Sequence, residues 1–99
     1  MKIQFTAITP ENSCYVFMFG EENYDNFLKY NELDVAFAPS WYEVCDVIKD
    51  KVIDYMIPTI KRDRAVSLSL GIENYVWLQL TTKYPLVNFI GAHLSVKLI

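Results

Sequence analysis

Residues 40–58 read SWYEVCDVIKDKVIDYMIP, and this stretch decides the fold because its spacing predicts one long amphipathic helix. Ser40 followed by Glu43 forms a capping-box pattern at the start, and Pro58 ends the helix, so we expect it to span 40–57. At about 100° per residue, its apolar side chains gather within one-third of the circumference: Trp41, Val44, Cys45, Ile48, Val52, Tyr55 and Met56. A helix with such a stripe covers one face of a sheet.

The flanking segments supply that sheet. Residues 2–8 alternate apolar and polar side chains as a half-buried strand does, and 14–19 are continuously apolar, which is typical of a strand buried on both faces. Strand patterns also occupy 33–39, 65–71, 74–82 and 93–99, whereas 83–92 fits a helical turn or a strand. Residues 21–31 have helical spacing with acids in the first turn.

These elements predict a single α+β domain over residues 1–99. It contains a mostly antiparallel sheet of about five strands, with the long helix (40–57) packed on one face and a short helix (21–31) beside it.

The apolar content is high for a chain of 99 residues: 53% is hydrophobic and 15% aromatic. A domain of this size buries only about two-thirds of the surface that its unfolded chain exposes, so part of the surplus should reach the surface. A homodimer or a complex with a larger protein would bury it, and so would an aromatic-lined ligand pocket.

Charge is unevenly distributed along the chain. Residues 1–54 hold ten acids and four bases, a net charge of −6, whereas residues 55–99 carry +3. The first half therefore disfavours direct contact with nucleic acid and would attract a basic protein surface. The sequence has neither the roughly 20-residue apolar run of a membrane span nor the apolar block of a signal peptide. We expect a cytoplasmic protein whose two cysteines are free thiols.

The candidate site lies on the long helix, opposite its apolar stripe. Four carboxylates fall within an arc of about 80° there: Glu43, Asp46, Asp50 and Asp54. Tyr42 and Val47 border this arc, as apolar residues border charges at a protein interface. Two readings stay open, a solvated outer face and a recognition surface for a basic partner, and these six residues are the predicted partner-binding residues.

Catalytic and cofactor motifs are missing. Cys45 and His93 could form a thiolate–imidazole pair, but Cys45 falls on the apolar stripe, where cysteine acts as a small buried hydrophobe. The glycines are isolated, which excludes phosphate-binding loops, and one histidine with two cysteines is too few for a structural zinc site. We therefore predict no catalytic residue, metal or cofactor.

The favoured hypothesis is a small non-enzymatic protein-binding module, an inhibitor or adaptor of a larger protein or complex. Abundant Ile, Asn, Lys, Tyr and Phe with only two arginines is typical of low-GC genomes, including those of bacteriophages. A phage or mobile-element anti-defence protein in the host cytoplasm would fit, with carboxylates presented to a site that normally binds nucleic acid. A dimeric small-molecule-binding or regulatory domain is the alternative, and a small Cys/His enzyme is less favoured.

Overall fold

The computed structural model describes residues 1–34, 38–49 and 59–99, with three strands and three helices in these ranges. The strands are β1 (Ile3–Ile8), β2 (Cys14–Phe19) and β3 (His93–Leu98), and the helices are α1 (Glu21–Tyr30), α2 (Trp41–Lys49) and α3 (Thr59–Lys83). The sheet is antiparallel throughout with the order β2-β1-β3, so the first strand of the chain is central. The α+β class and its antiparallel sheet are thus confirmed. The prediction of about five strands and one long helix over 40–57 is wrong in detail: α2 is described over Trp41–Lys49, residues 50–57 lie outside the described residues, and the longest described helix is α3.

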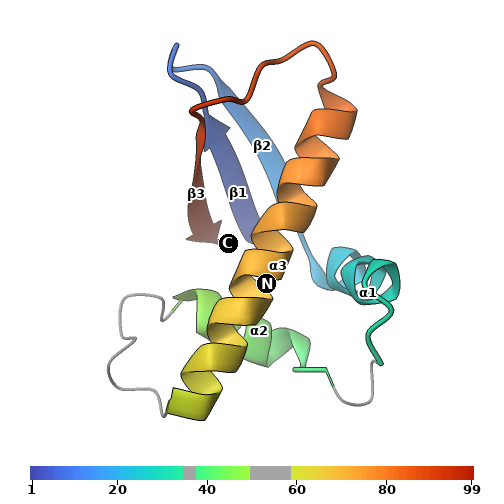
Figure 1. Cartoon of the computed structure of the whole chain (residues 1–99). Helices are drawn as coiled ribbons and strands as arrows, with labels where there is room; N and C mark the ends of the chain where they lie inside the picture. The colour runs from blue at the N-terminus through green and yellow to red at the C-terminus, as the bar shows by residue number, and fades with distance from the viewer. Residues whose placement is uncertain (35–37, 50–58) are drawn as a thin grey trace.

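The long α3 lies across one face of the sheet, and α1 and α2 lie at the end of the sheet where β2 ends (Figure 1). The long α3 crosses that face and packs against β2, while α2 packs against β3 and α3 near the end of the sheet where both termini lie. On β1, the alternation predicted from the sequence holds: Ile3, Phe5 and Ala7 are at most 1% exposed. The core therefore fills the space between one sheet face and the helices.

Residues 65–71 and 74–82 were predicted as strands, and this prediction is wrong because they belong to α3. Their apolar residues fit both a period of two and, in the series Leu68, Ile72, Val76 and Leu80, a spacing of four residues. Burial follows the helical spacing, since Ile72, Val76 and Leu80 are fully buried whereas Leu78 is 40% exposed. A strand would have placed Leu78 on the same face as its two neighbours.

Gly71 was taken as a strand end and lies inside α3 instead. A Cβ atom at this position would lie 3.3 Å from the ring of Phe27 on α1. The absence of a side chain thus lets α3 approach α1 closely, which offsets the lower helix propensity of glycine.

The sheet is also narrower than predicted. Residues 33–34 and 38–39 are not in a strand, and 35–37 lie outside the described residues, so the strand predicted over 33–39 is not confirmed. Residues 84–92 connect α3 to β3 through turns, neither a helix nor a strand. β2 is an edge strand with one exposed face, so its predicted burial on both faces is wrong.

The aromatic surplus lies largely in ring–ring contacts that join the helices to the sheet. Phe19 on β2 meets Phe5, Trp41 and Tyr75 with ring centroids 5.9–6.3 Å apart. At the other end of β2, the Tyr15 ring contacts Tyr84 and Phe89 at 4.9 and 5.4 Å. Such pairs add to the stabilisation from apolar burial.

Candidate protein-binding surface

The start of α2 is fixed by the capping box predicted from the sequence. The Ser40 backbone N–H donates to Glu43 Oε2 at 2.9 Å, and the Glu43 backbone N–H donates to Ser40 Oγ at 3.3 Å. The pair satisfies two backbone donors at the helix start. One oxygen of the Glu43 carboxylate therefore caps the helix, although the side chain as a whole is exposed to solvent.

Trp41 fixes which face of α2 points outward. Its ring packs against Phe19 and Tyr24, and its indole Nε1–H donates to the Met1 carbonyl oxygen at 3.1 Å. With Trp41 turned inward, Val44 and Cys45 are also buried, at 0% and 2% exposure. The predicted apolar stripe is confirmed for these three residues.

The opposite side of α2 is exposed, as predicted. Tyr42 is 76% exposed, and Glu43 and Asp46 are exposed beside it. The side chain of Val47 is not among those described, and Asp50 and Asp54 lie outside the described residues. The part of the predicted site that the structure describes thus consists of Tyr42, Glu43 and Asp46, which lie within about one and a half turns of α2.

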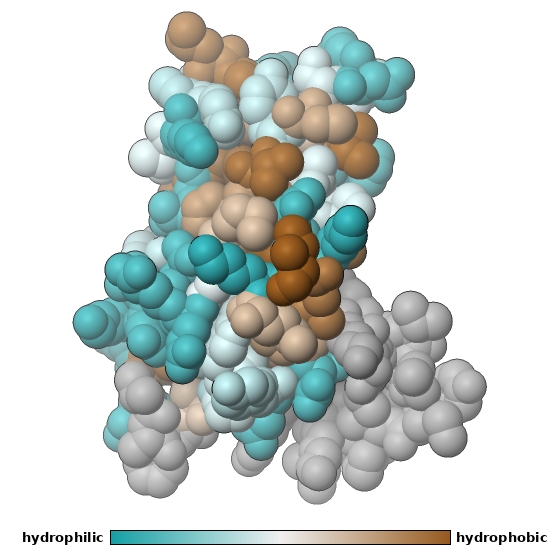
Figure 2. Space-filling model, turned by 180° about the vertical axis from the view of Figure 1, so that it is seen from behind, coloured by the Kyte–Doolittle hydropathy of each residue, from teal (hydrophilic) through white to brown (hydrophobic). Residues whose placement is uncertain are grey.

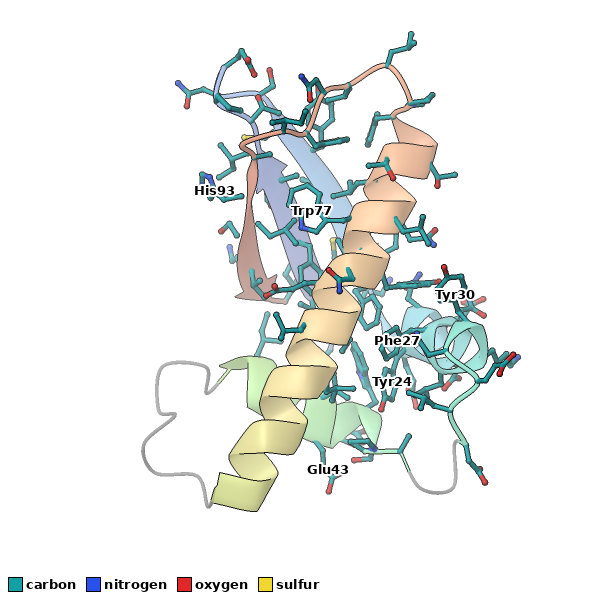
Figure 3. All side chains as sticks on the ribbon, viewed as in Figure 1. Tyr24, Phe27, Tyr30, Glu43, Trp77 and His93 are labelled. Carbon is teal, nitrogen blue, oxygen red and sulfur yellow. The ribbon has the colours of Figure 1, made fainter. Side chains whose placement is uncertain are left out.

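A second helix contributes acids that the sequence reasoning did not assign to the site. Tyr24 projects from α1 toward the start of α2 (Figure 3). It is buried, and its hydroxyl donates to the Pro39 carbonyl oxygen at 2.7 Å, just before α2 begins. Burial is the main cause that raises the pKa of Tyr24 to about 12, and the carboxylates of Glu43 and Asp25 contribute to that rise. The Tyr24 ring also contacts the ring of Trp41, with centroids 6.0 Å apart, so α1 lies beside the start of α2.

We call the combined region the acidic surface and define it by the exposed carboxylates of Glu21, Glu22, Asp25, Glu43 and Asp46. The three from α1 fall within about 100° of its circumference, and this arc borders the buried residues of the helix. Among the described residues, none of the carboxylates of Glu21, Glu22, Asp25 and Asp46 forms an ion pair with a base.

The charge count of this region supports the grouping. Residues 21–46 hold seven acids and one base, Lys29, a net charge of −6 in a protein whose total is −3. This local count could have identified α1 from the sequence, because its net charge of −6 exceeds that of residues 40–57, which hold four acids and two bases, a net charge of −2. A surface with this charge excess attracts cations and basic proteins over a distance of about 8–10 Å at physiological salt.

The two residues considered for catalysis are not brought together. Cys45 is buried in the core on α2, and burial raises the pKa of its thiol, an effect to which Asp46 adds and which the N-terminal amine opposes. His93 is exposed at the start of β3, opposite Ile8, at the end of the sheet away from α2 (Figure 3). A buried thiol with a raised pKa holds little of the thiolate that a nucleophile requires.

Within residues 1–34, 38–49 and 59–99, no group of three or more His, Cys, Asp or Glu side chains could hold a metal ion. None of the helices in the same ranges combines the length and the apolar character needed to cross a bilayer. Comparisons with protein-family models, with curated proteins and with solved structures give no match.

Proposed function

We propose that this protein is a small non-enzymatic binding module that docks through its acidic surface on a basic surface of a larger protein, as an inhibitor or an adaptor. The observation that carries the proposal is the position of α1 beside the start of α2, given by the Tyr24–Pro39 hydrogen bond and the Tyr24–Trp41 ring contact, with exposed acids on both helices. Acids on two separate helices define an area, whereas acids on a single exposed helix are also what a solvated face looks like.

The geometry favours preorganised recognition. The Tyr24–Pro39 hydrogen bond ties α1 to the residues before α2, and Trp41 ties α2 to Phe19 and to the N-terminus. The carboxylates therefore stand on elements whose mutual position is set by packing, so little conformational entropy is lost when a partner binds. Arginine and lysine side chains of a partner would meet them by charge-assisted hydrogen bonds.

Tyr42 adds an aromatic side chain to this charged area. It is 76% exposed and is followed directly by Glu43 in the chain. Tyrosine is enriched among the residues that dominate binding energy at interfaces, where a ring of polar contacts excludes water around it. We assign Tyr42 as the apolar anchor of the proposed interface and the carboxylates as its rim.

We extend the proposal to a phage or mobile-element anti-defence protein. Carboxylates spaced along two helices occupy sites built for phosphates, because both groups are bound by the same arginine and lysine geometry. The sequence composition supports this origin, and the dimeric small-molecule-binding alternative stays a prediction.

Affinity capture with matched charge reversals tests the proposal. Tagged wild-type protein, Asp25→Lys and Asp46→Lys serve as baits in bacterial host lysate, with Glu11→Lys in the β1–β2 turn as a control of equal charge change. We expect one stoichiometric protein with the wild type and with Glu11→Lys, and its loss with the other two baits. Recovery of the same protein by all four baits, or of none by the wild type, would reject the acidic surface as the contact.

A salt series separates recognition from non-specific attraction. Binding through a few ion pairs around an apolar anchor weakens between ~50 and ~500 mM salt but persists in part, whereas purely ionic adsorption is abolished. Tyr42→Ala should then weaken the high-salt component, and unchanged high-salt binding of this variant would remove Tyr42 from the interface.

A further inference from the structure

The two edges of the sheet differ in how they are protected. β3 carries Lys97 and His93 on its exposed face, while β2, CYVFMF, has no charged residue and no proline. Charged side chains and prolines are the usual means by which proteins prevent a free edge from pairing with another strand. β2 lacks both, so nothing in its own sequence opposes such pairing.

The hydrogen bonds between β1 and its two neighbours show which residues of β2 direct their backbone N–H and C=O groups to the free edge. Thr9 donates its backbone N–H to the Ser13 carbonyl at 2.9 Å, and Lys2 and Ile99 exchange hydrogen bonds at 2.9 and 3.0 Å. Because bonded and non-bonded pairs alternate in an antiparallel ladder, the odd-numbered residues of β1 bond to β2 and the even-numbered ones to β3. In β2, the backbone groups that point to the free edge are therefore those of Cys14, Val16 and Met18.

The same three residues expose their side chains on the sheet face that none of the described helices covers. Val16 is 40% and Met18 38% exposed, and Cys14 is an exposed free thiol. Figure 2, seen from behind the sheet, shows apolar areas in the middle of this face between hydrophilic ones. A continuously apolar strand is typical of a sheet interior, yet β2 lies at an edge, so its composition fits a larger sheet than one chain provides.

We propose that β2 pairs antiparallel with β2 of a second copy, with the two-fold axis at Val16, to form a continuous six-stranded sheet. This register places Val16 opposite Val16 and Cys14 opposite Met18 of the other copy. All three outward-pointing residues then form bonded pairs, with about six backbone hydrogen bonds between the copies. With the axis at Phe17 instead, Cys14 would lie opposite Gly20 of the other copy. Gly20 is beyond the end of β2, so the backbone groups of Cys14 would have no partner within the strand.

A second copy is the occupant that the edge suits best. Every side chain that would meet across the new ladder is uncharged on both copies, so no like charges are opposed despite the net charge of −3. The strand length also matches itself, and isologous pairing closes the assembly at two copies instead of leaving a new edge of the same kind. This assembly leaves the acidic surface out of the ladder and does not depend on the proposed function.

Sedimentation velocity of the full chain from ~10 µM to ~1 mM tests the pairing, in the range where a short ladder of this size should associate. Val16→Lys places two ammonium groups directly opposite each other, and Ser95→Lys is the matched control because Val16 and Ser95 flank the same residue, Thr6, on the same sheet face. We expect a concentration-dependent dimer for the wild type and Ser95→Lys, and at least a ~10-fold weaker dimer for Val16→Lys. A wild-type monomer throughout, or equal dimerisation of both variants, would overturn the proposal.

A disulfide test examines the register. In Cys14→Ser/Val16→Cys, the introduced thiols would face each other at a Cα separation of about 5.5 Å, within the range that a disulfide spans. Mild oxidation should give a covalent dimer, whereas Cys14→Ser/Ser95→Cys should stay monomeric under the same conditions. Cross-linking of both variants to the same extent, or of neither, would contradict a two-fold axis at Val16.

Discussion

The sheet interior and the α1–α2 corner are held by different kinds of interaction. Phe5, Ile3 and Phe19 are buried at 0–1% exposure and make only apolar contacts, which depend little on pH or salt. The corner is held by a helix cap and by a tyrosine hydrogen bond, both beside carboxylates. Substitutions in the interior should therefore cost stability, whereas those on the outside of the corner should cost binding and leave the fold intact.

The largest stability loss is expected from Phe5→Ala. Phe5 is 1% exposed and meets Phe19 edge-to-face at 6.0 Å, so truncation removes apolar burial and leaves a cavity. We expect a loss of about 3–5 kcal/mol in the free energy of unfolding measured with urea.

The control is Thr6→Ala, the next residue on the same strand, whose side chain lies on the uncovered sheet face. It should cost less than about 1 kcal/mol. If Phe5→Ala does not fold, Phe5→Leu, expected to cost about 1–1.5 kcal/mol, gives the measurement. Equal losses at positions 5 and 6 would contradict a core on one sheet face only.

Much of the difference between the sheet interior and the α1–α2 corner can be predicted from the sequence. Alternation in residues 3–8 and 93–98, and the capping box at Ser40, need only local spacing, and all three are confirmed. The helical state of 59–83 is not readable in the same way, since residues 65–82 satisfy both periods and only packing decides between them.

Strand order and the composition of the site depend on tertiary contacts. That β1 is central and β2 is at the edge follows from pairing with a strand some ninety residues further along the chain. The exposure of Glu43 and Asp46 follows from their place on the helix, whereas the grouping of the α1 acids with them requires the docking of α1 beside the start of α2. Sequence spacing carries no information on that contact.

High pH should weaken the corner first. The pKa of Tyr24 is 10.0 in the unfolded chain and about 12 in the folded one. Between these pH values the Tyr24 hydroxyl is ionised in the unfolded state and still protonated in the folded state. The stabilisation is complete below pH 10 and is lost as the pH rises toward 12, by about 1–2 kcal/mol after allowance for solvent screening.

Urea unfolding of the wild type and of Tyr24→Phe at several pH values from 8 to 12 measures this loss. At pH 8 the variant should be less stable by about 1 kcal/mol, because its hydrogen bond to Pro39 is gone. The difference should shrink or reverse as the pH rises. Parallel curves over the whole range would show that Tyr24 is not held in the protonated form by the fold.

The capping box should contribute less than the core and about as much as one hydrogen bond. Ser40→Ala removes the oxygen that accepts the Glu43 N–H and should cost about 1 kcal/mol. Ser95→Ala, at an exposed position on β3, should change stability by less than about 0.5 kcal/mol. If both serines behave alike, α2 does not depend on its cap.

Glu43→Gln distinguishes the cap from the charge. Glutamine keeps an oxygen that can accept the Ser40 N–H, so stability should fall by less than about 0.5 kcal/mol. Partner binding should weaken nonetheless, because one carboxylate of the acidic surface is neutralised. A variant that binds as well as the wild type would assign Glu43 a purely structural role.

The most direct test of the acidic surface is the affinity of the captured partner for Asp46→Lys relative to Glu11→Lys. Both changes replace an exposed acid by lysine, and each should alter the free energy of unfolding by less than about 0.5 kcal/mol. Titration calorimetry should give a dissociation constant at least ~10-fold higher for Asp46→Lys, and one within ~2-fold of wild type for Glu11→Lys. Equal dissociation constants for the two variants would show that binding responds to total charge, or lies elsewhere, and would contradict recognition by the acidic surface.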